Sequence, residues 1–234
     1  MRLQNMSKYI YSLLIFSVIN LTTLAQTRPK AARDSVFYHG AYLGISLIEP
    51  VKSFFSATWG SSVQLDVNLL NRFFPVVELG YAQAKLVNPE QTRFDTKAIY
   101  YKAGINLPIA KEGPNAENLF FLGGRLGYCS FDYSISGCVF DGSYWNRGYM
   151  KDFLNEHAGA AWGEVLAGLR VQLFGPVSLG WSGRMKTTFK VRNGEHSVPP
   201  YIPGYGLNQK PNYDLLLHLY FRLPGSGTKT NKRL

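Results

Sequence analysis

The chain has 234 residues, within the range of one all-β domain; 15% of them are aromatic and 23 are glycine. Its formal net charge of +10 would suit a nucleic-acid partner, but an export signal at the N-terminus argues against one. After that signal no run approaches the roughly 20 apolar residues of a membrane-spanning helix, so any passage of the mature chain through a membrane must use strands.

Residues 1–25 have the pattern of a cleavable signal peptide. Arg2 and Lys8 supply positive charge, residues 9–22 are mostly apolar, and residues 23–25 form a small-residue cleavage site. The alternative is an uncleaved anchor helix, which the shortness and the polar residues of the stretch disfavour. The remaining expected parts are a flexible leader over 26–37, a β-barrel domain over 38–224 and a basic flexible tail over 225–234.

Eight segments of the chain alternate aliphatic with small or polar residues. Val63 and Leu65, for example, alternate with Gln64 and Asp66. Side chains change face at every residue of a strand, so each segment has one apolar and one polar face. The predicted strands cover residues 38–48, 61–69, 73–85, 97–108, 119–131, 162–174, 177–190 and 212–223.

The connections between these strands are alternately long and short. Long ones follow the first, third, fifth and seventh strands, as in a barrel with both chain ends on one side of a membrane. The sequence therefore predicts an all-β fold, an eight-stranded antiparallel up-and-down transmembrane β-barrel. Within the longest connection, residues 132–160, the segment Met150–His157 is expected to form one or two helical turns.

The composition of the polar face separates a membrane barrel from a soluble one. A soluble barrel is apolar inside and polar outside, whereas here the polar face is rich in glycine, which indicates a crowded interior. We therefore expect the aliphatic face to contact lipid. Exposed aromatic residues are expected near its two ends, with Phe73, Phe120 and Phe221 at one and Tyr101 and Tyr128 toward the other.

Charged residues on the inward face must pair, because a buried unpaired charge costs several kcal/mol or more. We predict a salt-bridged network that closes the lumen to ions. The alternative is a narrow polar conduit, or an anion site near Arg125, Arg170 and Arg184. The predicted network consists of Asp66, Glu78, Lys102, Arg125, Glu164, Arg170, Arg184, Asp214 and Arg222.

The two cysteines, Cys129 and Cys138, are nine residues apart across an expected strand–loop junction. An exported protein meets an oxidising compartment, so we predict a disulfide between them; the alternative is two unpaired thiols. No histidine stands at a metal-ligand spacing from either cysteine, and no nucleotide or phosphate motif is present. Neither a metal nor a cofactor is expected.

Catalytic motifs are lacking too. The four histidines, His39, His157, His196 and His218, are scattered, and no serine lies in a nucleophile elbow, so we do not expect an enzyme. Aromatic residues of the loops are candidates for binding sugars or a partner protein; the alternative is packing over the barrel mouth. These residues are Tyr144, Trp145, Tyr149, Tyr201 and Tyr205.

Four segments carry a resemblance to a known family. They are FFLGGRLGY at 120–128, WGEVLAGLRV at 162–171, LGWSGRMK at 179–186 and YIPGY at 201–205. Together they resemble an uncharacterised family of Bacteroidetes outer-membrane β-barrel proteins, a domain of unknown function, similar to small barrels of the OmpA and OmpW type. The resemblance implies an outer-membrane barrel without a known activity. The chain departs from the family pattern where it continues past Phe221 through a basic tail.

The expected function is that of a monomeric outer-membrane protein in contact with lipid. Its closed barrel would present long outer loops for binding or structural work, with a surface polysaccharide or a protein as partner and no nucleic acid. One alternative is a narrow pore or small-molecule conduit; a second is an outer-membrane enzyme.

Overall fold

The computed structural model describes residues 37–52, 57–89, 91–111, 118–140 and 149–223. The predicted signal peptide, its cleavage site and the basic tail lie outside these residues. Among the described residues, none of the helical structure could span a membrane.

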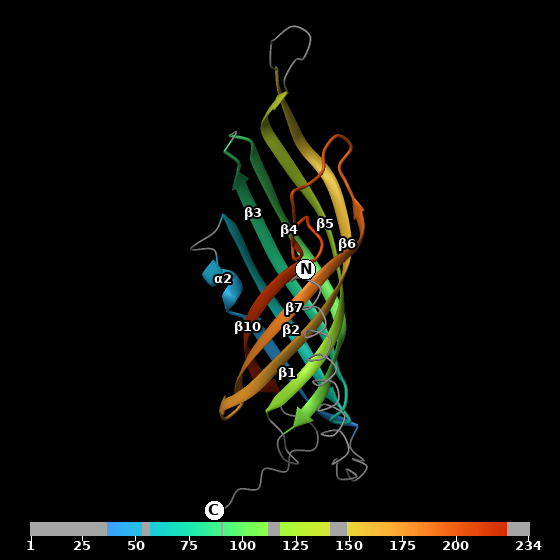
Figure 1. Cartoon of the computed structure of the whole chain (residues 1–234). Helices are drawn as coiled ribbons and strands as arrows, with labels where there is room; N and C mark the ends of the chain where they lie inside the picture. The colour runs from blue at the N-terminus through green and yellow to red at the C-terminus, as the bar shows by residue number, and fades with distance from the viewer. Residues whose placement is uncertain (1–36, 53–56, 90, 112–117, 141–148, 224–234) are drawn as a thin grey trace, which may run out of the picture. The chain divides into compact units, whose positions relative to one another are not determined.

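Eight strands close into an antiparallel barrel in which sequence neighbours pair and β10 returns to β1 (Figure 1). The order around the ring is β1, β10, β7, β6, β5, β4, β3, β2. The all-β, eight-stranded up-and-down architecture predicted from the sequence is thereby confirmed. The barrel strands are β1 (Tyr38–Ser46), β2 (Thr58–Leu69), β3 (Phe74–Val87), β4 (Arg93–Lys111), β5 (Leu119–Phe140), β6 (Tyr149–Phe174), β7 (Val177–Arg192) and β10 (Asn212–Leu223).

The aliphatic face of each strand points outward and the polar face inward. On β3, Val77 and Leu79 are 61% and 51% exposed, whereas Glu78 between them is 1% exposed. We call the outward aliphatic and aromatic surface the apolar band. It includes residues 99–107 of β4 and 120–128 of β5. Nine residues at about 3.3 Å each, tilted by about 40°, rise roughly 23 Å, close to the height of the apolar belt on membrane barrels.

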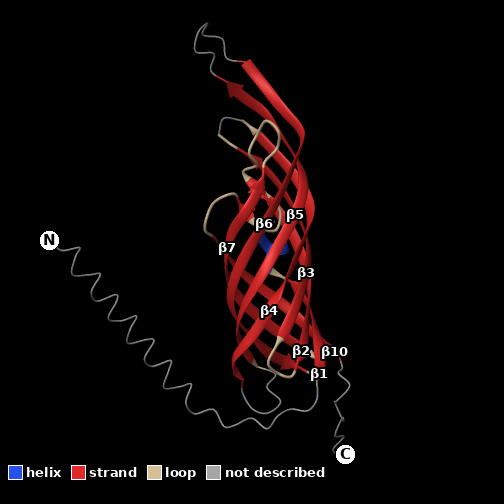
Figure 2. Ribbon diagram, turned by 90° about the vertical axis from the view of Figure 1, so that its right-hand side faces the viewer, coloured by secondary structure: helices blue, strands red, loops and turns tan. Residues whose placement is uncertain are grey.

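At one end of the band the pattern inverts. Beyond Tyr128 on β5 the outward residues are Ser130 and Asp132, while Phe131 and Tyr133 are buried inside. Strands β5 and β6 continue well past the other strands here (Figure 2). The expectation of helical turns over Met150–His157 is therefore wrong, because this segment pairs with β5 as part of β6.

Strand β1 is short and leaves a notch in the barrel wall. Its pairing with β2 ends at Ile45 and Val63, and its pairing with β10 ends at Ser46 and His218. Beyond this point the barrel pairings of the described residues join β2 only to β3, and β10 only to β7. A five-residue helix, α2 (Ile48–Lys52), contacts both strands at the notch. The sequence predicts only a long connection between the strands 38–48 and 61–69 here, so the helix is an addition to that prediction.

The connection between β7 and β10 folds into the mouth of the barrel. It carries a small hairpin of β8 (Tyr201–Ile202) and β9 (Gly206–Leu207). Ile202 and Tyr205 are buried in a cluster with Tyr100 of β4 and Trp162 of β6. The hairpin therefore covers the lumen from this side.

The predicted disulfide is absent. Both thiols are free; Cys129 is buried and Cys138 is half-buried. The two cysteines lie on the same extended strand, β5, and nine residues of strand span about 30 Å, whereas bridged Cα atoms must lie within about 7 Å. The prediction failed because it placed a turn where β5 continues.

Candidate functional site

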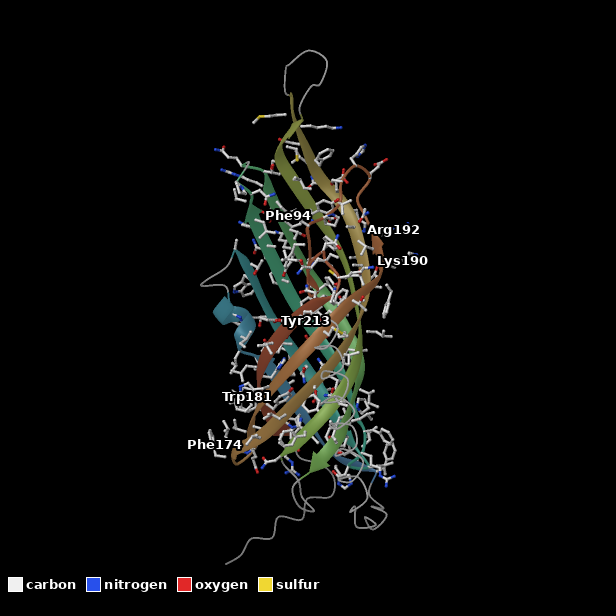
Figure 3. All side chains as sticks on the ribbon, in the orientation of Figure 1. Phe94, Phe174, Trp181, Lys190, Arg192 and Tyr213 are labelled. Atoms are coloured by element: carbon white, nitrogen blue, oxygen red, sulfur yellow. The ribbon has the colours of Figure 1, made fainter. Side chains whose placement is uncertain are left out.

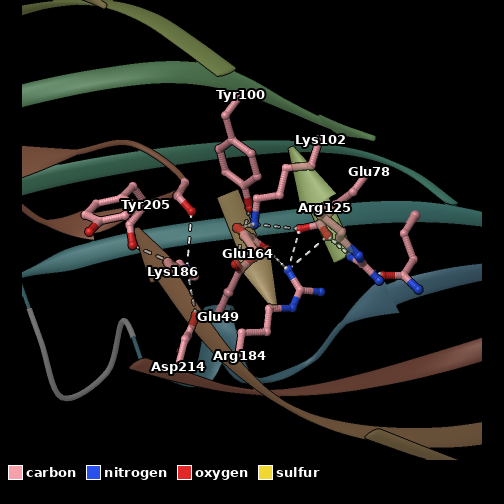
Figure 4. Close-up of polar contacts among 12 residues, drawn as sticks. Glu49, Glu78, Tyr100, Lys102, Arg125, Glu164, Arg184, Lys186, Tyr205 and Asp214 are labelled. Carbon is pink, nitrogen blue, oxygen red and sulfur yellow. Dashed lines mark hydrogen bonds and ion pairs between the residues drawn. The ribbon is translucent and has the colours of Figure 1, made fainter. Parts of the chain in front are cut away.

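The centre of the lumen holds five charged side chains from five consecutive strands, which we call the charge layer (Figure 4). Its carboxylates are Glu78 of β3 and Glu164 of β6, and its cations are Lys102, Arg125 and Arg184. Lys102 Nζ lies 3.2 Å from Glu78 Oε1 and 3.1 Å from Glu164 Oε1. Arg184 Nη1 lies 3.0 Å from Glu78 Oε2 and 3.3 Å from Glu164 Oε2, and Arg125 Nη1 also pairs with Glu78.

Strand register produces this arrangement. Glu78 stands opposite Lys102 in the β3–β4 pair, and Arg125 stands opposite Glu164 in the β5–β6 pair. None of the five side chains is more than 2% exposed. Such charges remain stable out of water only when each has close partners of opposite sign, and both carboxylates here have at least two.

A second ion pair lies on the side of the charge layer nearer Tyr38 of β1 and Leu223 of β10. Arg170 Nη1 is 3.5 Å from Asp66 Oδ2, and its guanidinium stacks 3.7 Å from the centre of the Tyr42 ring. Gln64 links this pair to the charge layer, since its amide donates to Asp66 at 2.8 Å and its carbonyl accepts from Arg125 at 3.2 Å. The lumen is thus filled by one connected polar network.

On the mouth side of the charge layer, two charged residues outside the predicted network, Lys186 and Glu49, make further polar contacts. Lys186 Nζ lies 3.2 Å from Asp214 Oδ2 and donates to the carbonyls of Gly204 and Tyr205 at 3.3 Å. Glu49 of α2 accepts a hydrogen bond from the Tyr100 hydroxyl at 3.2 Å. With both included, the acids are Glu49, Asp66, Glu78, Glu164 and Asp214, and the bases are Lys102, Arg125, Arg170, Arg184 and Lys186.

The structure brings eight of the nine predicted network residues into these contacts. The ninth, Arg222, is half-buried near the end of β10, opposite Tyr42 of β1. Lys186 could have been found from the sequence, because it shares the inward face of its strand with Arg184. Glu49 could not, because its position depends on a helix that the alternation does not reveal.

A cavity of about 340 Å³ lies between the charge layer and the hairpin, at the notch between β2 and β10. Glu49, Lys186 and Tyr100 line its inner part, and the exposed aromatic residues Trp59 and Tyr213 line its outer part. Oε2 of Glu49 is buried and makes no hydrogen bond in the described part of the chain. The cavity therefore offers a free carboxylate oxygen to a ligand that carries a hydrogen-bond donor or a positive charge.

Of the loop aromatic residues proposed for sugar or partner binding, the structure describes the side chains of Tyr201 and Tyr205, and these two do not form an exposed platform. Tyr205 is 1% exposed and packs edge-on against Trp162 at 5.9 Å. Tyr201 is half-buried in β8. Both pack over the mouth, which was the alternative reading. Tyr144 and Trp145 lie outside the described residues, and Tyr149 is the first residue of β6.

The β7–β10 connection is also held by hydrogen bonds to the extended ends of β5 and β6. The backbone N–H of His196 donates to both carboxylate oxygens of Glu156, at 3.0 and 3.2 Å, and His196 Nδ1 lies 3.1 Å from Oε1. The Tyr133 hydroxyl donates to the carbonyl of Ser197 at 2.7 Å. The hydrogen bonds from His196, its backbone N–H first among them, lower the pKa of Glu156 below its usual value.

Acidification is expected to weaken the hydrogen bonds between His196 and Glu156. Since the pKa of Glu156 is lowered in the folded state, its contribution to stability is present at neutral pH and is lost as the pH falls through the lowered value. Amide hydrogen exchange of His196, corrected for its intrinsic pH dependence, should therefore lose protection under acid conditions. Glu156→Gln should show the low protection at every pH; a parent chain whose protection is equal at pH 7 and pH 3 would contradict this.

No group of three or more His, Cys, Asp and Glu side chains among the described residues could hold a metal ion. No curated protein matches the chain. A family model described as a domain of unknown function, DUF6048, matches residues 6–224, which include the whole barrel. The chain therefore belongs to the DUF6048 family.

Proposed function

We propose that this protein is an outer-membrane β-barrel, exported by its N-terminal signal, that is closed at its centre and binds a ligand at its mouth. The apolar band carries the proposal. Large aliphatic and aromatic side chains are exposed on the same outward face of neighbouring strands, among them Ile105, Leu122, Leu126 and Val165. A soluble surface rarely exposes contiguous apolar patches above a few hundred Å², whereas lipid chains would cover such a band.

The charge layer supports closure of the lumen. A continuous water-filled path would leave its side chains in contact with water, yet they are at most 2% exposed. The wide pores of larger barrels have polar walls that remain wet. Here the ion pairs are packed against one another, so ions have no route through this level of the barrel.

The mouth cavity supports binding as the task of the closed barrel. It is bounded inward by charged groups and opens sideways at the notch between Trp59 and Tyr213. Aromatic residues of this kind favour the boundary between lipid and water. A ligand with an apolar part and a donor group for Glu49 would suit both ends of the cavity.

Planar-bilayer recording tests the closure. The purified chain, shown by heat-modifiable gel migration to be refolded in detergent, should insert without producing stepwise ion conductance. Arg125→Ala should lower the barrel's resistance to urea, since it removes one cation from the charge layer, and should leave conductance absent. Stable parent channels whose conductance changes in Arg125→Ala would contradict closure, and a chain that stays in the aqueous fraction without detergent would contradict the membrane barrel.

A further inference from the structure

Outside the lumen, three polar side chains form a chain of hydrogen bonds on the outer face of β5 and β6. His157 stands opposite Asp132 in the strand pair, and its Nδ1 lies 2.7 Å from Asp132 Oδ1. Its other ring nitrogen, Nε2, lies 3.1 Å from Ser130 Oγ. A carboxylate, an imidazole and a hydroxyl are thus connected in series, and the proposed binding and closure of the barrel use none of them.

This order of groups is the one required for an activated serine. A carboxylate at Nδ1 holds the proton on that nitrogen and orients the ring, which leaves the lone pair of Nε2 directed at the hydroxyl. A histidine in this state accepts the hydroxyl proton when the oxygen attacks an ester carbon. Strand geometry fixes the arrangement, since Ser130 and Asp132 are two residues apart on one face of β5.

The cluster lies where the apolar band ends. Tyr128, the outward residue before Ser130 on β5, is exposed and belongs to the band. The side chains of Asp132 and His157 are 71% and 64% exposed. On the membrane placement proposed above, the hydroxyl would therefore face the level at which acyl chains join their head groups.

Exposed basic residues surround the cluster at the same end of the barrel. Lys97 stands opposite Asp132 in the register of β4 and β5, and Arg192 stands opposite Gly159 in the register of β6 and β7. Lys190 and Arg192 lie toward this end of the barrel, whereas Phe174 and Trp181 lie near the other end (Figure 3). These cations suit an anionic head group.

Space for a substrate lies beside the hydroxyl. Gly159 stands opposite Ser130, and a Cβ added at Gly159 would meet only the Cys129 carbonyl, at 3.7 Å. Arg192 follows on the next strand, so an ester carbonyl above Gly159 would lie between the serine and a guanidinium. A cation in that position stabilises the negative charge that develops on the carbonyl oxygen.

From this geometry we propose that Ser130, His157 and Asp132 form a serine esterase site on the outside of the barrel, acting on acyl esters of membrane amphiphiles with anionic head groups. Ser130 Oγ attacks the ester carbon and its proton passes to His157 Nε2. The carbon–oxygen bond to the alcohol then breaks, and the alcohol leaves with that proton. Water attacks the acyl-serine, again giving a proton to His157; the fatty acid leaves, and Ser130 recovers the proton.

Covalent labelling tests the nucleophile directly. The full chain, refolded in detergent micelles, is treated with an alkyl fluorophosphonate probe, and the labelled residue is identified by mass spectrometry. We expect the label on Ser130, and labelling at least 100-fold slower in Ser130→Ala and His157→Ala. Ser134→Ala is the matched control, since Ser134 lies on the same strand and accepts a hydrogen bond from the Asn155 N–H instead; it should label like the parent.

Hydrolysis of phosphatidylglycerol in mixed micelles gives a second readout. Asp132→Asn should slow it by a factor of about 10 to 10⁴, because the imidazole loses its orienting carboxylate, and Arg192→Gln should slow it as well. Heat-modifiable migration of every variant shows separately that the barrel has formed. A folded parent barrel that neither takes the label on Ser130 nor hydrolyses the lipid would overturn the esterase site while leaving the membrane barrel intact.

Discussion

Replacing Glu78 by Gln is expected to lower the free energy of unfolding by about 3–5 kcal/mol, or to prevent refolding altogether. Glu78 is the acceptor of three cations, Lys102, Arg125 and Arg184. Gln keeps the size of the side chain and removes its charge, so three buried cations would be left to share Glu164. Urea titration of the refolded barrel, followed by gel migration, measures the loss. Glu195→Gln, at an exposed position of the β7–β10 connection, is the control and should be neutral.

A second substitution tests whether charge balance is the cause. Glu78→Gln combined with Arg125→Gln removes one charge of each sign from the charge layer and should recover part of the lost stability. A double variant that is weaker than the sum of the two single variants would contradict this explanation. Equal urea resistance of Glu78→Gln and Glu195→Gln would contradict the structural role of the layer itself.

The strands and their two faces could be predicted from the sequence because the membrane-barrel pattern has a period of two. Apolar residues such as Val77 and Leu79 alternate with polar or small residues such as Glu78 and Gly80. The face of each side chain therefore follows from the alternation, and the pairing of neighbouring strands follows from the short connections between them. The inward charges were found in the same way. What the pattern cannot supply is which of them touch, because contacts across the lumen depend on how the ring closes.

The extension of β5 and β6 was missed because the pattern inverts there. Up to Tyr128 the outward residues are apolar; beyond it Ser130 and Asp132 face outward and Phe131 and Tyr133 face inward. A search for one constant face ends the strand at this point and then places a loop and a helical turn. The sequence did carry a signal for the longer strand, because apolar and polar residues keep alternating beyond Tyr128, with the apolar residues now on the inward face.

The mouth and the outer polar cluster depend on contacts between distant segments. Helix α2 has only five residues and contains Pro50, so it is too short for a helical period of apolar residues to predict it. His157 appeared as one of several scattered histidines because its approach to Ser130 is set by the β5–β6 register, and spacing along the chain does not give that register. The strands and the inward charges could therefore be predicted from the sequence, whereas the helix and hairpin at the mouth and the outer polar cluster could not.

The packing of the hairpin into the mouth should also be sensitive to added side-chain volume, in that a single added methyl group there should lower the free energy of unfolding. Gly80→Ala is expected to cost about 3 kcal/mol, because a Cβ at Gly80 would lie 2.1 Å from Cζ of Tyr100, a ring that is buried. The ring cannot retreat toward the hairpin, since Gly204 already packs against its other atoms: a Cβ there would lie 2.4 Å from Cγ. Gly204 has φ of +79°, a region that glycine adopts without strain.

Urea titration compares Gly80→Ala with Gly124→Ala, whose added Cβ would meet only the Glu164 carbonyl at 4.0 Å. Tyr100→Leu in the Gly80→Ala background should restore part of the lost stability, because the shorter side chain gives the new methyl group room. The double variant should also expose the β8–β9 hairpin to protease, since the hairpin then lacks the ring it packs on and Glu49 loses its hydroxyl donor. A Gly80→Ala barrel as stable as Gly124→Ala would mean that the Tyr100 ring can move, and hence that the hairpin is not held in the mouth by this packing.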